Sequence, residues 1–192
     1  MRIANIVQDS IVDGPGLRFV VFVQGCSHGC KGCHNPGTHD PAGGYEMSVD
    51  EILEMIHKNP LVQGVTISGG EPFDQVEECL KLAHGVWELG LKLWVYTGYT
   101  FEQLWTRSID EFDVDMLLDH IDVLVDGPFI ESQKSYDLRW RGSRNQRLID
   151  VQATFDTEEI DVVLWEPSPR DTERGVLTGK WAELEKFEVP ES

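Results

Sequence analysis

The chain has 192 residues, of which 41% are hydrophobic and 26% are charged, a composition typical of a globular domain of ordinary size. Its formal net charge of −18 argues against a nucleic-acid or anionic-membrane surface, because such partners attract basic patches. The N-terminus lacks the basic start and long apolar stretch of a signal peptide, and no segment reaches the ~20 apolar residues of a membrane span. We therefore expect a cytoplasmic protein that binds neither nucleic acid nor membrane.

Apolar runs and helical periodicities alternate along the chain. Residues 17–23 are typical of a buried strand, and Ser48 with Glu51 forms a capping box that opens a helix over residues 49–57. The later elements follow the same alternation, with strands at 64–67, 91–97, 122–125 and 147–151 and helices at 73–89 and within 101–120. Strands that alternate with helices pair in parallel, so we expect an α/β fold, either a barrel or a doubly wound sheet.

In either architecture, active residues collect at the carboxyl ends of the strands. Four loops follow predicted strands and should converge there: a cysteine-rich loop and residues 68–72, 97–99 and 126–128. The end of the chain differs in composition, because residues 152–192 carry 11 Asp and Glu against four Lys and Arg. We predict a main domain over residues 1–151 and an acidic C-terminal extension over 152–192, with a candidate strand at 160–165.

Three of the four cysteines stand close together directly after the first predicted strand. Cys26, Cys30 and Cys33 have C-x₃-C-x₂-C spacing, and in a reducing compartment such cysteines bind a metal more often than they form disulfides. A four-iron cubane needs four ligands, usually thiolates, so three cysteines leave one iron open for a small molecule. The alternative is a Cys₃His zinc site completed by His28 or His34, although a second ligand pair at zinc-finger separation is missing.

The remaining cysteine and a group of arginines are less informative. Cys79 lies near the apolar stripe of its predicted helix, so we assign it to the core. Arginines at 139, 141, 144 and 147 form a basic cluster in an acidic chain. They are expected either to grip carboxylates of a cofactor or partner, or to form surface ion pairs.

The cysteine motif and residues 68–72, with the sequence Ser-Gly-Gly-Glu-Pro, resemble the radical S-adenosylmethionine enzymes. Within that superfamily, the chain is most similar to the activating proteins of anaerobic ribonucleoside-triphosphate reductase. The narrower resemblance rests on residues 13–18 (DGPGLR), Gly32, 94–99 (WVYTGY), 123–127 (VLVDG) and 139–147 (RWRGSRNQR). It covers roughly residues 1–151.

The resemblance implies an incomplete (β/α) barrel of the radical SAM type. It also implies that Cys26, Cys30 and Cys33 bind three irons of a [4Fe–4S] cluster, while S-adenosylmethionine chelates the fourth iron. Reductive cleavage would then generate a glycyl radical on the large subunit of anaerobic ribonucleotide reductase, with a flavodoxin or ferredoxin as electron donor. No catalytic residue beyond the cluster ligands is implied.

The resemblance assigns the methionyl ammonium of S-adenosylmethionine to the segment after the second predicted strand. Gly69 and Gly70 would allow the backbone to approach this group closely, and Glu71 would support it by charge. From the residues alone, an ordinary strand-to-helix turn is the favoured interpretation of the two glycines.

By the same resemblance, Gly32 and His34 contact S-adenosylmethionine around its adenine. Asp126 is either an acceptor for the ribose hydroxyls or a helix cap or turn former. His34 with Asn35 is closer to pyruvate formate-lyase activating enzymes, so activation of that enzyme or of another glycyl radical enzyme is the alternative function. A non-enzymatic zinc-binding module is the alternative of a different class.

Overall fold

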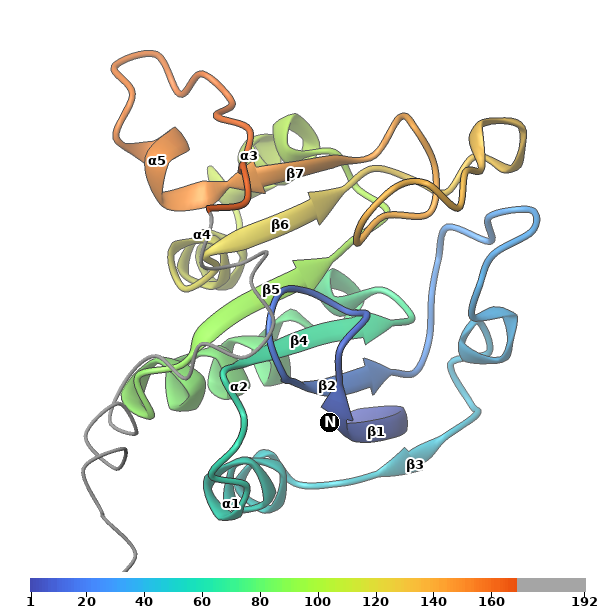
Figure 1. The fold of residues 1–192 in the computed structure, drawn as a ribbon, viewed down its shortest axis with the longest axis vertical. Coiled ribbons are helices and arrows are strands. Elements are labelled where there is room, and N and C mark those ends of the chain that lie inside the picture. The colour runs from blue at the N-terminus through green and yellow to red at the C-terminus, as the bar shows by residue number, and fades with distance from the viewer. Residues whose placement is uncertain (169–192) are drawn as a thin grey trace, which may run out of the picture.

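The structure is a computed structural model that describes residues 1–168. Its strands form one seven-stranded sheet in the spatial order β3-β1-β2-β4-β5-β6-β7 (Figure 1). In chain order they are β1 (Arg2–Ser10), β2 (Arg18–Val23), β3 (Tyr45–Glu46), β4 (Gly64–Gly69), β5 (Lys92–Tyr96), β6 (Val123–Asp126) and β7 (Arg147–Asp150). The four strands β2, β4, β5 and β6 run parallel, whereas β1, β3 and β7 pair antiparallel with their neighbours.

The helices pack against one face of this sheet. They are α1 (Val49–Lys58), α2 (Val76–Glu88), α3 (Phe101–Ser108), α4 (Phe112–Asp119) and α5 (Val151–Phe155), with 3-10 turns at Pro36–Thr38, Pro72–Asp74 and Glu131–Gln133. Alternate strand residues, among them Val21, Ile67 and Val95, share one buried apolar core with these helices. Side chains alternate between the faces of a strand, so the residues between them point to the other face of the sheet.

Two segments of the chain, one between β6 and β7 and one after α5, cover that other face near β5 and β6. Trp140 and Trp165 come from these segments and pack on Trp94 of β5, with ring centroids 5.6 and 5.0 Å from that of Trp94. The backbone N–H of Trp165 also donates to Leu148 O at 2.8 Å. This second apolar cluster therefore fixes the end of the described chain against the sheet.

Most predicted elements are confirmed, including the capping box, in which Ser48 Oγ accepts a 3.2 Å hydrogen bond from Glu51 N–H. The region 101–120 contains two helices, α3 and α4. The expected parallel pairing ends at β6, because the chain reaches β7 without a crossover helix and returns antiparallel. The candidate strand at 160–165 was wrong: it reduces to one bridge between Leu164 and Ile149, and Ile160 at its start has a φ of 54°, outside the extended region. The sequence reading missed β1 and β3.

The fold is α/β, and its sheet is open because it ends in two edges, β3 and β7. A barrel of the radical SAM type stays a prediction, as does the domain boundary at 151. Part of the predicted acidic extension is described: Phe155 packs on Phe101 and Trp105, with centroids 6.2 and 5.8 Å apart. The rest of that extension, 169–192, lies outside the described residues. No helix within residues 1–168 has the length and apolar character needed to cross a membrane.

Candidate functional site

The parallel strands end on one side of the sheet, at the right of Figure 1. Hydrogen bonds join the loops that follow them. Glu71 N–H, after β4, donates to Gly25 O, after β2, at 2.8 Å, and Gly127 N–H, after β6, donates to Tyr99 O, after β5, also at 2.8 Å. The predicted convergence of these loops at one edge is confirmed.

The three motif cysteines lie on the loop that leaves β2, which we call the cysteine loop (residues 24–35). Cys26, Cys30 and Cys33 are free, partly buried thiols. The N–H of Asn35 donates to Cys33 Sγ at 3.3 Å, the kind of contact that tunes a metal-bound thiolate. Burial is the main cause that raises the pKa of the Cys26 thiol, so a metal must displace its proton on binding.

The donor set on the cysteine loop consists of three thiols, the usual ligands of an iron–sulfur cluster. Among residues 1–168, no three His, Cys, Asp or Glu side chains are close enough to hold a single metal ion. The ligands of a four-iron cubane need not converge on one point, because each thiolate binds a separate iron. Both histidines of the zinc alternative have other contacts: His28 Nε2 is 2.8 Å from Glu71 Oε2, and the His34 ring centroid is 4.8 Å from that of Phe129.

Glu71 lies between these loops with its side chain fully buried. Its Oε1 accepts hydrogen bonds from Phe73 N–H at 3.0 Å and from the Thr97 hydroxyl at 2.9 Å. Its Oε2 accepts from Gly98 N–H at 2.8 Å and bonds to His28 Nε2 at 2.8 Å. The hydrogen bond to Glu71 is the largest cause that raises the pKa of His28. One carboxylate therefore ties the cysteine loop to the loops after β4 and β5.

The contacts of Glu71 bear on its predicted role. Charge support for the methionyl ammonium stays a prediction, and both carboxylate oxygens are already engaged by protein donors. From the sequence, residues 97–99 were expected at this edge, but Thr97 was given no role, and His28 was considered only as a zinc ligand. The available signal was their position, because both are polar residues on loops at the carboxyl edge of the sheet.

The two glycines that precede Glu71 are required by close backbone packing. Gly69 has a φ of 95°, and a Cβ placed on it would lie 2.8 Å from Phe22 Cα. A Cβ on Gly70 would lie only 2.1 Å from Gly25 O. The N–H of Gly70 donates to Val23 O at 2.7 Å, so the loop after β4 rests directly on the chain that leaves β2.

Gly32 and His34 face the chain segment between β6 and β7. Gly32 has a φ of 73°, and a Cβ there would lie 3.0 Å from Glu131 Oε1. The ring of His34 packs on Phe129, and a Cβ on Gly142 would lie 2.9 Å from His34 Cε1. The contact with S-adenosylmethionine predicted for Gly32 and His34 stays a prediction, while their contact with this segment was not foreseen.

Asp126, at the end of β6, is 1% exposed and bonds to two other elements. Its Oδ2 accepts from Phe101 N–H, the first residue of α3, at 2.9 Å, and its carboxylate pairs with the Arg147 guanidinium. Arg147 also forms two 2.9 Å hydrogen bonds with Glu102, which lower the pKa of Glu102 to about 2. These contacts are those of the helix-cap alternative, and a ribose contact stays a prediction.

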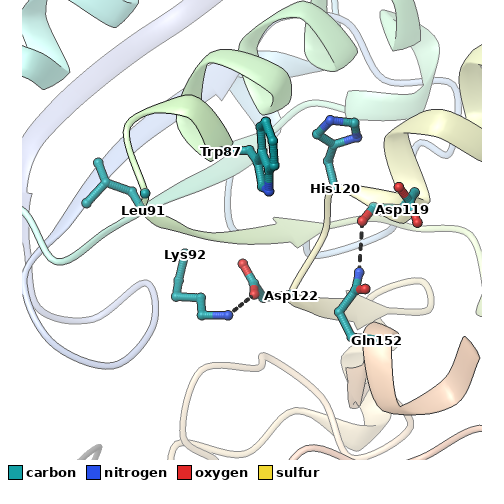
Figure 2. A pocket seen from close by; sticks show the side chains of 8 residues that line it. Trp87, Leu91, Lys92, Asp119, His120, Asp122 and Gln152 are labelled. Carbon is teal, nitrogen blue, oxygen red and sulfur yellow. Dashed lines mark hydrogen bonds and ion pairs between the residues drawn. The ribbon is translucent and has the colours of Figure 1, made fainter. Parts of the chain in front are cut away.

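A pocket of about 330 Å³ lies at the opposite edge of the sheet, where β5 and β6 begin. Figure 2 shows the Lys92–Asp122 ion pair beside it, the Gln152 amide that donates to Asp119 O at 2.8 Å, and the Trp87 ring. The pocket lies at the amino ends of the parallel strands, whereas the candidate site lies at their carboxyl ends. The two are therefore separate.

Known proteins share the part of the chain that carries this site. Residues 12–149 match the family model described as a 4Fe-4S single cluster domain. The anaerobic ribonucleoside-triphosphate reductase-activating protein of Vibrio cholerae is 38% identical over 144 residues, which cover 71% of this chain and 89% of that relative. The protein of the same name from Escherichia coli K12 is 36% identical, and the match covers 71% of this chain and 90% of that relative. The one from Enterobacteria phage T4 is 32% identical, and the match covers 77% of this chain and 93% of that relative. The matched residues include the cysteine loop and the loops after β4, β5 and β6.

Proposed function

The chain belongs to the family of anaerobic ribonucleoside-triphosphate reductase-activating proteins, and from this premise we propose that it cleaves S-adenosylmethionine reductively and generates a glycyl radical on an anaerobic ribonucleotide reductase. The observation that carries the proposal is the set of three free thiols on the cysteine loop, which Glu71 joins to the neighbouring loops. The arrangement supports a cluster held by three protein ligands at the carboxyl edge of an α/β sheet.

Cys26, Cys30 and Cys33 would hold three irons of a [4Fe–4S] cluster and leave the fourth iron for S-adenosylmethionine. A cluster bound there would supply the one electron for cleavage of the sulfonium C–S bond. The net products would be methionine, 5′-deoxyadenosine and a glycyl radical on the reductase, whose glycine Cα would give up the hydrogen atom.

The chain's own residues would position S-adenosylmethionine. An ammonium group requires acceptors, and the N–H of Gly70 already donates to Val23 O, so the methionyl ammonium would bind carbonyl oxygens of Gly69 and Gly70. The imidazole of His34 would lie against the adenine beside Gly32, since a flat ring stacks on a base. Glu71 would hold the loops in place through its four hydrogen bonds and add negative charge near the ammonium.

The test uses anaerobically purified protein and has three readouts: iron and sulfide content, 5′-deoxyadenosine formed with dithionite, and a glycyl EPR doublet on added reductase large subunit. Cys33→Ala should abolish all three, and Cys79→Ala is the matched control because Cys79 is buried in the core. A colourless protein with one zinc and no iron would refute the proposal.

A second target is favoured by one observation, the His34–Asn35 pair after the third cysteine, which resembles pyruvate formate-lyase activating enzymes. The same reconstituted protein should therefore be mixed in parallel with pyruvate formate-lyase. A glycyl doublet on the ribonucleotide reductase alone supports the first target. A doublet on the formate-lyase alone would assign the chemistry to that enzyme instead.

A further inference from the structure

The Lys and Arg side chains of residues 1–168 are paired unevenly. Seven of them form ion pairs with Asp or Glu: Arg2, Lys31, Lys58, Lys81, Lys92, Arg107 and Arg147. Arg18 is 2% exposed and donates to Thr66 Oγ1 and to backbone carbonyl oxygens. The others, which have no carboxylate partner within the described residues, all lie in one segment: Lys134, Arg139, Arg141 and Arg144.

We call residues 128–146, between β6 and β7, the basic arm. One of its acidic residues, Glu131, is already paired with Lys31 at 3.2 Å, which leaves Asp137 as the other acid of the arm. The arm is therefore positively charged on a protein whose formal net charge is −18. Cations that have no carboxylate partner among residues 1–168, in a chain with this excess of carboxylates, point to an external anionic partner.

The basic arm lies beside the cysteine loop, as Figure 1 shows for the yellow and orange segment after β6 and the blue segment after β2. The contacts are direct: Lys31 pairs with Glu131, and His34 packs on Phe129 with centroids 4.8 Å apart. A partner bound to the arm would thus stand next to the loop that carries Cys30 and Cys33.

The arm is held in a defined shape. Its two sides are joined by hydrogen bonds, one of them from Arg144 N–H to Gln133 O at 3.0 Å. Trp140, with a φ of 56°, is anchored between Trp94 and Trp165, and its carbonyl accepts a 2.8 Å bond from the Tyr96 hydroxyl. A preorganised surface loses little conformational entropy on binding.

We propose that the basic arm is the docking surface for the acidic one-electron donor protein that reduces the cluster. The inference rests on the proposed function, because only a cluster on the cysteine loop makes electron delivery at this place useful. Electrostatic complementarity steers an acidic protein to this surface and orients it toward the loop, while the rest of the protein repels it. Redox partners form weak, short-lived complexes whose interfaces lie at the low end of interface size.

Two other occupants fit less well. The remaining segment of the chain, 169–192, carries six Asp and Glu against four Lys and Arg, so its charge is too nearly balanced to neutralise the arm. Nucleic acid is the less suitable partner because the net charge of −18 on the protein would repel its phosphate backbone around the basic arm.

The test measures reduction of the reconstituted cluster by an acidic flavodoxin in its hydroquinone form, by stopped-flow absorbance at low and high salt. Arg139→Glu/Arg144→Glu should slow this reaction at low salt by about tenfold or more and remove most of its salt dependence. The matched control is Lys58→Glu/Lys81→Glu, which changes the net charge equally on exposed helical sites away from the arm. It should leave the flavodoxin reaction nearly unchanged.

A second measurement separates docking from the proposed chemistry. Dithionite is a small reductant that needs no docking surface, so 5′-deoxyadenosine formed with dithionite should be the same for the arm variant and the parent. Flavodoxin affinity, measured by titration, should fall with Arg139→Glu/Arg144→Glu and also, less strongly, with Arg139→Gln/Arg144→Gln. Loss of the dithionite reaction in the parent would refute the proposed function alone.

Two results would overturn the docking proposal. One is an arm variant that binds flavodoxin and is reduced by it like the parent. The other is an arm variant that keeps its flavodoxin reaction but no longer binds the reductase, which would assign the arm to that protein instead.

Discussion

Replacing Glu71 with alanine should lower the free energy of unfolding by about 2–6 kcal/mol, because it leaves two inward-facing backbone donors without an acceptor. These donors are the N–H groups of Phe73 and Gly98, which bond to Glu71 at 3.0 and 2.8 Å. Each unsatisfied buried donor costs about 1–3 kcal/mol. The Thr97 hydroxyl can rotate to another acceptor and the His28 ring is partly exposed, so neither enters the sum.

Glu71→Gln should cost less, about 1–3 kcal/mol, because the amide oxygen still accepts from Phe73 while the amide NH₂ faces the Gly98 donor. The measurement is urea unfolding followed by tryptophan fluorescence under thiol-reducing conditions. The control is Glu54→Ala, which removes an exposed ion pair with Lys58 on α1 and should leave the free energy of unfolding nearly unchanged. If Glu71→Ala destabilises the protein no more than the Glu54→Ala control does, the Glu71 carboxylate does not hold the loops together.

Three further changes probe other parts of the structure. Gly70→Ala should destabilise the protein by about 1–3 kcal/mol and lower its iron content, since the new Cβ would lie 2.1 Å from Gly25 O. The control in the same unfolding and iron assays is Gly37→Ala, because a Cβ on Gly37 meets nothing within 4 Å. Cys79→Ala should keep full iron content while losing roughly 1 kcal/mol of stability, and a loss of iron would show that this buried thiol is a ligand. Glu102→Gln should cost less than about 1 kcal/mol at pH 7, because the side chain is largely exposed. That cost should shrink as the pH falls from 4.5 toward about 2, since the pKa of Glu102 is about 2 when folded and 4.5 ordinarily; a cost that persists at the lowest pH would contradict the ion pair.

Local patterns in the sequence predicted the parallel strands and their helices well, because apolar periodicity and capping residues are local signals. They missed β1, whose residues Arg2–Ser10 do not follow the alternation of a half-buried strand and whose burial is likewise irregular. They also placed a strand at 160–165, where the positive φ of Ile160 and the packing of Trp165 on Trp94 decide the path of the chain. Both errors arise where tertiary contacts outweigh local preference.

In the candidate site, too, features that are local in the sequence could be predicted and contacts between distant residues could not. The three cysteines lie close together in the sequence, and Gly69 and Gly70 are adjacent, so two short motifs can record them. The partners of Glu71 are distant in the chain: Thr97 is 26 residues away and His28 is 43. The cations of the basic arm are likewise distinguished only in space, because none of them has a carboxylate partner among residues 1–168. The motif therefore names the ligands, whereas the position of those ligands depends on one buried carboxylate whose contacts form only when β2, β4 and β5 are assembled in parallel.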